Sequence, residues 1–438
     1  MSTEPKTARE MGRRIRRLVL RALMHVLFRM GVSRALLPLR WEDRLKNQIL
    51  LRLFRADTAD SKALRVSGRE SGIGVNLFGM LEAPTGMGES ARSSARALAA
   101  AGVPVFPMSF VSSDIYGSIP LFRRGAAKPY PINLCHVNAP QTAYFMRRFG
   151  PDTFTGRFNI GYWVWELERF PPHWDACFSY YDEIWTPSTF SQRAIAARTS
   201  IRVICVPHCI HIPVQDTIKR STFGLPDDRT CILCMFDMGS LPERKNPLGA
   251  IKAFRDGGGD NPRALLVLKI SFAARNPRAR REIHEALQGL EAVVIEREMS
   301  REESWGLIGT CDAVISLHRT EGFGLILAEA MALGKPVIAT DYSGNTDFMN
   351  PENSYPVGSR LVTLERETGP FPAGSRWAEP DIEQAAAQIR AILRDPEGAK
   401  EIGRKGAGDI ASRFSPKVVG ELMRARLQTL GIVSVPPC

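Results

Sequence analysis

From about residue 70 onward, short apolar runs alternate with longer stretches of helical periodicity. Such alternation is typical of a doubly wound α/β domain, because parallel strands need long crossover connections, usually helices. The alternation is interrupted at about 212–228, where Pro, Asp and basic residues gather. We therefore predict two Rossmann-like parallel-sheet domains. The predicted strands are 73–78, 103–106, 132–136, 159–163, 183–185 and 203–206 in the first domain, and 231–236, 264–270, 292–295, 313–317 and 337–340 in the second.

Helix starts are predicted near Ser90, at Ser188 as an N-cap, and near Asn246, Arg278, Arg301, Leu325 and Asp381. Together with the strands they divide the chain into five parts. These are a basic amphipathic helical extension (1–68), a first domain (69–215), a linker (216–228), a second domain (229–412) and a C-terminal helix (413–438).

The positive charge of the chain is concentrated at its N-terminus. Residues 1–55 hold 14 basic and 4 acidic residues, whereas the whole chain has a net charge of +12. Apolar residues over 12–30 recur at helical spacing, and Arg13, Arg17 and Arg21 line another face. Such a helix either lies on an anionic membrane surface or packs on the protein itself, and both alternatives stay open. The segment lacks the aromatic interleaving and motifs of a nucleic-acid binder, so no nucleic acid is expected.

The expected location is the cytoplasm, or the inner face of the cytoplasmic membrane if the N-terminal helix binds lipid. No uninterrupted apolar run of about 18 residues is present, so a membrane-spanning helix is not predicted. Arg21 and His25 interrupt the apolar region at the N-terminus, which argues against a signal peptide. The eight cysteines are scattered through apolar runs, as in a reduced chain without a disulfide framework.

One cluster of possible metal ligands lies at the end of a predicted strand. It consists of Cys205, His208, Cys209 and His211. Side chains from one strand end would not converge well on a single ion, so we do not predict a metal site there.

The segment 316–331 carries most of the candidate chemistry. It reads as the end of a buried strand, a Gly-Phe-Gly turn and a helix. This arrangement brings backbone N–H groups and a helix N-terminus to the carboxyl edge of the sheet, which suits a phosphate. Glu321 precedes the helix and Glu329 lies on its second turn. Because carboxylates repel phosphate, their natural partners are hydroxyls, and a ligand with both groups is a nucleotide sugar.

Two other segments are suited to an anion. Gly86 and Gly88 are expected to form a turn before the first helix, where small residues let the backbone approach a phosphate. Arg244 and Lys245 stand just before a predicted helix. Cations at a helix start have no favourable dipole partner, so we expect these two to await an anion.

The Glu321-x7-Glu329 pair, inside Glu-Gly-Phe-Gly and followed by Ala-Leu-Gly-Lys-Pro-Val-Ile-Ala-Thr at 332–340, resembles the C-terminal domain of retaining glycosyltransferases of family 4. The resemblance covers 311–348. It implies the GT-B fold, in which two Rossmann-like domains face each other across a cleft. In that fold the final helix crosses back to the first domain, and the stretch after Pro416 would do so here.

The resemblance also implies roles for individual residues. Glu329 would accept hydrogen bonds from the ribose, and Glu321 would hold hydroxyls of the transferred sugar near the anomeric centre. Arg244 and Lys245 resemble the basic pair that binds the diphosphate and stabilises the departing nucleotide. The further donor-binding positions would be the Gly86-Gly88 turn and the backbone of Phe323, Gly324 and Leu325, with Lys269 and His318 as lesser candidates.

The chain departs from the family at one position of the basic pair. The family places an arginine directly after the glycine that follows the strand, whereas Ser240 follows Gly239 here. Arg244 would then take over that task. In the first domain, His136 closes a predicted strand, where the family often has a histidine that contacts the sugar or the incipient oxyanion; a structural role is the alternative.

The aromatic run 162–166, with Trp174, could line an acceptor pocket, but ordinary core packing is the favoured interpretation. No Asp-x-Asp pair is evident to hold a divalent cation, so the basic residues would neutralise the diphosphate and no cofactor is expected.

The predicted function is transfer of a hexose, with retention, from a nucleoside diphosphate sugar to a glycan or lipid-linked acceptor, as in surface polysaccharide or glycolipid assembly. An inverting GT-B enzyme, in which His136 would act as base, and a catalytically silent GT-B protein remain the alternatives. A Rossmann-type dehydrogenase is disfavoured, because no Gly-x-Gly-x-x-Gly follows a strand with an acidic residue downstream.

Overall fold

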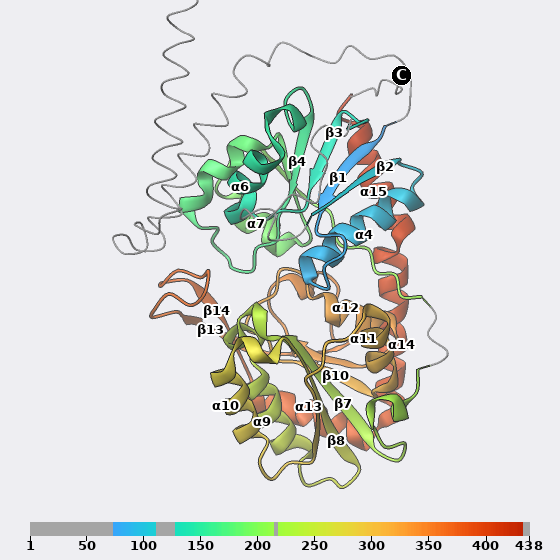
Figure 1. Cartoon of the computed structure of the whole chain (residues 1–438). Coiled ribbons are helices and arrows are strands. Elements are labelled where there is room, and N and C mark those ends of the chain that lie inside the picture. The colour runs from blue at the N-terminus through green and yellow to red at the C-terminus, as the bar shows by residue number, and fades with distance from the viewer. Residues whose placement is uncertain (1–72, 111–127, 214–217, 432–438) are drawn as a thin grey trace, which may run out of the picture.

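The computed structural model describes residues 73–110, 128–213 and 218–431. These residues form two α/β lobes, each built on a six-stranded sheet (Figure 1). The predicted N-terminal helix over 12–30 and the first residues of the predicted linker lie outside the described residues. Within the described ranges, no helix is long and apolar enough to cross a membrane.

The first lobe has an all-parallel sheet with the strand order β2-β1-β3-β4-β5-β6. The order reverses between β1 and β3, which is where the loops after parallel strands diverge and a ligand can bind. The strands are β1 (Val75–Gly79), β2 (Val105–Ser109), β3 (Ile132–Cys135), β4 (Phe158–Tyr162), β5 (Glu183–Thr186) and β6 (Arg202–Cys205). The helices are α4 (Gly86–Ala100), α6 (Ala139–Phe149) and α7 (Thr189–Ala196), with short 3-10 turns at η2 (Pro151–Thr153) and η3 (Pro172–Tyr180).

The second lobe repeats this plan with the order β12-β11-β10-β7-β8-β9, also parallel. Here the order reverses between β7 and β10. The strands are β7 (Thr230–Asp237), β8 (Ala264–Ser271), β9 (Ala292–Ile295), β10 (Ala313–Ser316), β11 (Val337–Thr340) and β12 (Tyr355–Val357). The helices are α8 (Pro242–Lys245), α9 (Pro247–Gly258), α10 (Pro277–Ala286), α11 (Arg301–Thr310), α12 (Leu325–Ala332), α13 (Ile382–Arg394) and α14 (Pro396–Phe414), with 3-10 turns η4 (Arg220–Phe223), η5 (Met238–Ser240), η6 (Ala273–Arg275) and η7 (Gly344–Asp347).

Local sequence explains where several helices begin. The side chain of Ser188 accepts a hydrogen bond from the Ser191 amide, so the predicted N-cap of α7 is confirmed. Ser300 and Glu303 form a reciprocal capping box at the start of α11.

The final helix, α15 (Pro416–Gln428), lies against α4 of the first lobe (Figure 1). A Cβ atom on Gly420 would lie 2.1 Å from the carbonyl oxygen of Ala97, so only glycine allows this close approach. The chain therefore crosses from the second lobe back to the first.

The core of the first lobe is unusually aromatic. Trp163, Trp165 and Trp174 are 1%, 3% and 5% exposed and pack in one cluster with Phe170. The favoured interpretation of this run as core packing is confirmed, because these rings have no exposed face to offer an acceptor.

A two-stranded antiparallel hairpin, β13 (Ser359–Thr363) and β14 (Arg376–Pro380), was not predicted. It belongs to the second lobe in sequence, but Phe371 and Trp377 pack in the aromatic cluster of the first lobe. Arg376 also forms an ion pair with Glu168, at 2.8 Å. The hairpin thus fastens the two lobes together.

Candidate active site

The loops after β7 and β10 meet at the point where the strand order of the second lobe reverses. Arg244 and Lys245 lie on α8, after β7, and Glu321 lies on the loop after β10. The ammonium group of Lys245 donates to Oε1 of Glu321, and Nη1 of Arg244 lies 3.1 Å from Oε2. The expectation that these cations have no partner within the protein is therefore wrong, since both are paired with Glu321.

Backbone conformation and hydrogen bonds fix the position of these two loops relative to each other. Leu241 and Asn246, on either side of α8, have φ values of 61° and 51°, in the left-handed region that few residues adopt. The side-chain amide of Asn246 donates to the carbonyl of Leu317 (2.9 Å), which ties the end of α8 to the end of β10. Arg244 likewise donates from Nη1 to the carbonyl of Thr320 (2.9 Å). The basic residues and Glu321 are thus positioned by one hydrogen-bonded unit.

The charged groups of this unit shift the pKa values of one another. Burial by itself would raise the pKa of Glu321, but Lys245 and Arg244 outweigh burial and hold that pKa well below its usual range. Burial lowers the pKa of Lys245, while Glu321 opposes the shift. Glu321 is therefore an ionised carboxylate, able to accept hydrogen bonds from hydroxyls.

Glu329 lies on α12 and is paired with a residue that was not predicted for the site. Arg301, the first residue of α11, donates from Nη2 to Oε1 of Glu329, and its guanidinium carbon lies 5.0 Å from the centre of the Trp305 ring. Burial raises the pKa of Glu329; Arg301 opposes the shift, and the nearby Glu89 adds to it. The two glutamates of the motif thus have opposite pKa shifts.

Arg301 also reaches the opposite lobe. Its Nε lies 3.6 Å from Oε2 of Glu89, which is on α4 and 4% exposed. Glu89 forms further ion pairs with Arg92 (2.9 Å) and with Arg96. Burial would raise the pKa of Glu89, but these arginines, Arg301 foremost, lower it. A chain of charges therefore joins the two lobes beside Glu329.

A signal for Arg301 was present in the sequence. A cation at the first position of a helix is disfavoured by the helix dipole, and Arg301 directly follows the Ser300 cap. A carboxylate partner would offset this repulsion. The identity of that partner depends on how α11 and α12 pack, which the sequence pattern does not show.

The glycine turn was predicted wrongly, because Gly86 and Gly88 form the first turn of α4. The hydroxyl of Thr85 caps the helix by accepting from the Gly88 amide (3.2 Å). A Cβ atom on Gly88 would lie 2.3 Å from the carbonyl oxygen of Ala83, whereas one on Gly86 would meet nothing within 4 Å. Gly88 is therefore required by packing, and Gly86 leaves open space at the N-terminus of α4.

His136 follows β3 and is fully buried at the reversal point of the first sheet. Its Nδ1 lies 2.9 Å from the hydroxyl of Ser90, and its ring stacks on Tyr162 at 4.4 Å between centroids. Its Nε2 has no hydrogen-bond partner among the described residues. Burial lowers the pKa of His136 well below its usual value, and His208 adds to the shift. His136 is therefore a neutral imidazole with one nitrogen to offer.

The lesser candidates lie in different places. His318 is buried beneath the Glu321 loop, where its Nε2 lies 3.0 Å from Oδ1 of Asn345, so it supports the loop. Lys269 is buried on β8 and donates to Ser271 (2.9 Å). Burial lowers the pKa of Lys269, and Glu298 opposes the shift.

The start of α12 has the geometry expected of an anion site. Gly324 is its N-cap, with φ of 96°, and no side chain caps the helix. The first amides of the helix, including that of Leu325, are thus left without a side-chain acceptor. Phe323 is 3% exposed, and its ring packs against His208 of the first lobe at 5.0 Å. The backbone of 323–325 therefore lies where the lobes meet.

The Cys-His cluster is not arranged as a metal site. His208 stacks on Tyr162, and Cys209 donates to the carbonyl of Ser93 (3.1 Å). Within the described residues, no group of three or more His, Cys, Asp or Glu side chains is placed to hold a metal ion.

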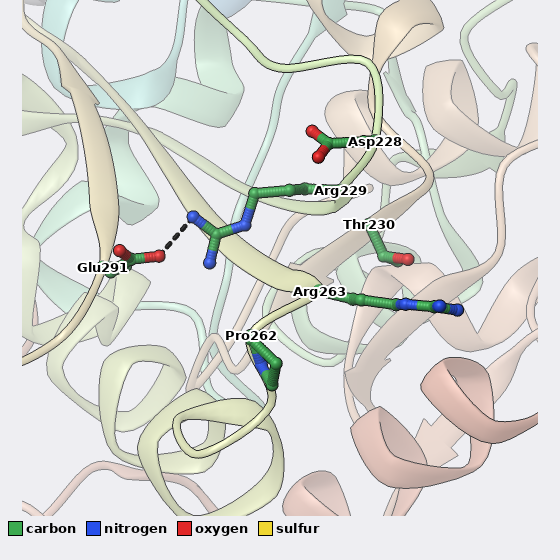
Figure 2. A pocket seen from close by; sticks show the side chains of 6 residues that line it. All are labelled: Asp228, Arg229, Thr230, Pro262, Arg263 and Glu291. Atoms are coloured by element: carbon green, nitrogen blue, oxygen red, sulfur yellow. Dashed lines mark ion pairs between the residues drawn. The ribbon is translucent and has the colours of Figure 1, made fainter.

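The hollow shown in Figure 2 lies elsewhere in the second lobe. It is lined by Asp228, Arg229, Thr230, Pro262, Arg263 and Glu291. These residues lie at the amino ends of β7, β8 and β9, where Arg229 pairs with Glu291. The hollow is thus at the opposite edge of the sheet from Glu321, and the candidate site is the carboxyl edge.

Comparisons with known sequences give one family match and one curated relative. Residues 217–409 match the model of the family described as glycosyl transferases group 1. Trehalose synthase of Rubrobacter xylanophilus is 28% identical over 122 residues, which make up 28% of this chain. The matched segment spans 24% of the length of that curated relative.

Solved structures share the architecture of both lobes. Sucrose-phosphate synthase of Thermosynechococcus elongatus superposes with a TM-score of 0.60 at 17% identity, covering 82% of this chain and 99% of that chain. HepE of Anabaena, solved in complex with UDP and glucose, has a TM-score of 0.57 at 13% identity, covering 82% of this chain and 100% of that chain. At these identities the likeness shows the fold.

The second lobe is therefore similar to glycosyl transferases group 1, and the expected GT-B fold is confirmed.

Proposed function

We propose that this protein transfers a hexose from a nucleoside diphosphate sugar to a hydroxyl of a glycan or lipid-linked acceptor, with retention at the anomeric carbon. The observation that carries the proposal is the pairing of Glu321 with Lys245 and Arg244 at the carboxyl edge of the second sheet. This unit combines a hydroxyl-binding carboxylate with two cations suited to a diphosphate. HepE, of the same fold, is solved with UDP-glucose, which supports this donor class.

In the proposed complex, the donor's ribose would take the place of Arg301 at Glu329. The diphosphate would lie on Lys245, Arg244 and the amides at the start of α12. The ribose hydroxyls would donate to Glu329, and the sugar hydroxyls to Glu321. Negative charge grows on the leaving diphosphate as its bond to the anomeric carbon breaks, so cations fixed there act most strongly in the transition state.

The acceptor would attack the same face of the sugar that the diphosphate leaves, and the leaving oxygen would take the acceptor's proton. The basic charge on Lys245 and Arg244 makes a divalent cation unnecessary in this proposal. Contact between the lobes, as at Ser188 and Gly322 (2.6 Å), would keep water from the donor.

An inverting reaction is the second proposal, because His136 is neutral and its Nε2 is unpartnered among the described residues. A neutral imidazole can act as a general base. The anomeric configuration of the first product, determined by NMR, distinguishes the two: the donor's configuration supports retention, and the opposite configuration supports His136 as base.

The direct test of the function is a panel of nucleotide sugars, followed by the melting temperature of the protein. A true donor should stabilise the folded state by a free energy that grows with the logarithm of its concentration once that exceeds the dissociation constant. No stabilisation by any nucleotide sugar would contradict the proposal and favour a catalytically silent protein.

The basic amphipathic segment over 12–30 supports a membrane-proximal acceptor in surface polysaccharide or glycolipid assembly. Deleting residues 1–55 should release the protein from anionic liposomes and leave donor hydrolysis intact. Continued sedimentation of the truncated protein with liposomes would contradict the membrane proposal.

A further inference from the structure

Glu166 lies on the first lobe, in the loop that follows β4, and faces the Glu321 unit of the second lobe. The hydroxyl of Thr320 donates to the carbonyl oxygen of Glu166, so the residue just before Glu321 is bonded to this loop. A Cβ atom built on Gly322 would lie 3.7 Å from Cγ of Glu166. The side chain of Glu166 therefore lies beside the Glu321-Gly322 backbone, across the boundary between the lobes.

The loop that carries Glu166 is rigidly held. Trp165 is 3% exposed, and its indole donates to the carbonyl of Arg169 (3.0 Å). The amide of Val164 donates to the side chain of Asn138 (2.8 Å). With buried side chains on both sides, the position of Glu166 is fixed by packing, as a substrate-binding residue requires.

The carboxylate of Glu166 lies near charged groups of the second lobe. The charged groups that act on it are Arg244, Glu321 and Lys245, in that order of strength. Burial raises the pKa of Glu166, Arg244 and Lys245 oppose the shift, and Glu321 adds to it. Among the described residues no cation forms an ion pair with Glu166, whereas Glu321 is paired with two.

We propose that Glu166 binds the acceptor by accepting a hydrogen bond from the hydroxyl that attacks the donor sugar. This inference rests on the proposed glycosyltransferase function. Glu166 is supplied by the lobe opposite the donor domain, and it faces the carboxylate that would hold the transferred sugar. An unpaired carboxylate has oxygen acceptors available for a hydroxyl, and a raised pKa strengthens such a hydrogen bond.

In the reaction, the acceptor oxygen forms a bond to the anomeric carbon while the bond from that carbon to the diphosphate oxygen breaks. The bonding electron pair leaves with the diphosphate, and the acceptor's proton passes to the same leaving oxygen. Glu166 gains no proton. It fixes the direction in which the hydroxyl oxygen presents its lone pair, and in donor hydrolysis it would orient a water molecule in the same way.

The test separates nucleophile positioning from donor binding, with Glu166→Ala and Glu166→Gln as variants. The probe is UDP-glucose, or whichever nucleotide sugar stabilises the protein most, with water as the nucleophile. The rate of donor hydrolysis at saturating donor should fall about tenfold or more in Glu166→Ala. Donor affinity by calorimetry should stay within about twofold or tighten, because a carboxylate near Lys245 and Arg244 has been removed.

Glu168→Gln is the matched control, since Glu168 lies on the same loop but pairs with Arg376 of the hairpin. It should leave hydrolysis and donor affinity within about twofold of wild type. Undiminished hydrolysis in both Glu166 variants would overturn the inference alone. Loss of donor affinity in step with hydrolysis would also overturn it, since that is the signature of general damage. A wild-type protein that binds no nucleotide sugar would overturn the proposed function and, with it, this inference.

Discussion

The two glutamates of the motif are eight residues apart and look equivalent in sequence, but the fold gives them different environments. Glu321 is paired with two cations from the neighbouring loop of its own lobe, and its pKa is lowered. Glu329 has one cation, Arg301, which also approaches Glu89 of the other lobe, and its pKa is raised. Their pKa shifts are opposite because burial outweighs the single arginine at Glu329, whereas the two cations outweigh burial at Glu321.

The difference indicates that the two carboxylates have different functions. Two fixed cations keep Glu321 ionised and in place, as a residue at the reacting sugar must be. Glu329 is held by one arginine whose partners span both lobes. The ribose could replace that arginine's contact, so donor binding and lobe contact would be coupled at Glu329.

The largest effect is expected for Glu321→Ala. Removing this carboxylate leaves Lys245 and Arg244 buried without their partner, which typically costs about 3–5 kcal/mol of unfolding free energy. Transfer should be lost as well, because the sugar hydroxyls lose their acceptor. Urea unfolding of the variant measures the first effect, and a loss under about 1 kcal/mol would show that the unit is not a buried pair.

Glu329→Ala should act mainly on nucleotide binding. Loss of the ribose contacts should weaken donor affinity by about 1–3 kcal/mol, as for a polar group left unpaired. Calorimetry with the preferred nucleotide sugar measures this, and Glu302→Ala, an exposed neighbour of Arg301 on α11, is the control. Equal affinity in the Glu329 variant and the control would remove Glu329 from the ribose site.

In acid, the two glutamates should change the free energy of unfolding in opposite directions. The pKa of Glu321 in the folded state lies below its ordinary value of 4.5, so its stabilising effect is present above pH 4.5 and is lost as the pH falls further. The pKa of Glu329 is raised, so its contribution has the opposite slope. Glu321→Gln should therefore flatten the loss of unfolding free energy in acid, and Glu329→Gln should not. Equal slopes in the two variants would contradict the assigned charge states.

The smallest effect is expected for Arg301→Gln, which leaves both carboxylates in place. Because Arg301 lowers the pKa of Glu329, its removal should raise that pKa further. Donor affinity, measured by calorimetry over a pH series, should then decline at a higher pH than in wild type as the pH is lowered. A pH dependence that coincides with wild type would show that Arg301 does not set the charge of Glu329.

Much of the fold could be predicted from periodicity. All eleven predicted strands are present, because each belongs to a parallel sheet and reads as a compact apolar run. The strand Tyr355–Val357 and the hairpin of β13 and β14 were missed. Leu361 on the hairpin is 43% exposed, while Phe371 and Trp377 are buried against the other lobe. The pattern of apolar residues along the hairpin does not show that it packs on the other lobe.

The same reason explains the errors at the site. Glu321, Lys245 and Arg244 were predicted to share a site, and they lie together because neighbouring strand ends meet at one edge. Their mutual pairing was not foreseen, since a run of residues shows which charges exist but not which of them meet. Glu89 and Glu166 were missed because their significance arises only where the two lobes touch, and Arg301 because its pairing with Glu329 depends on how α11 and α12 pack.

The most direct test of the account is a crystal structure with the nucleotide sugar that stabilises the protein most. We predict that the ribose hydroxyls contact Glu329 and that the diphosphate contacts Lys245, with Arg301 displaced from Glu329. A nucleotide bound elsewhere, or one whose ribose lies away from an intact Glu329–Arg301 pair, would contradict the account.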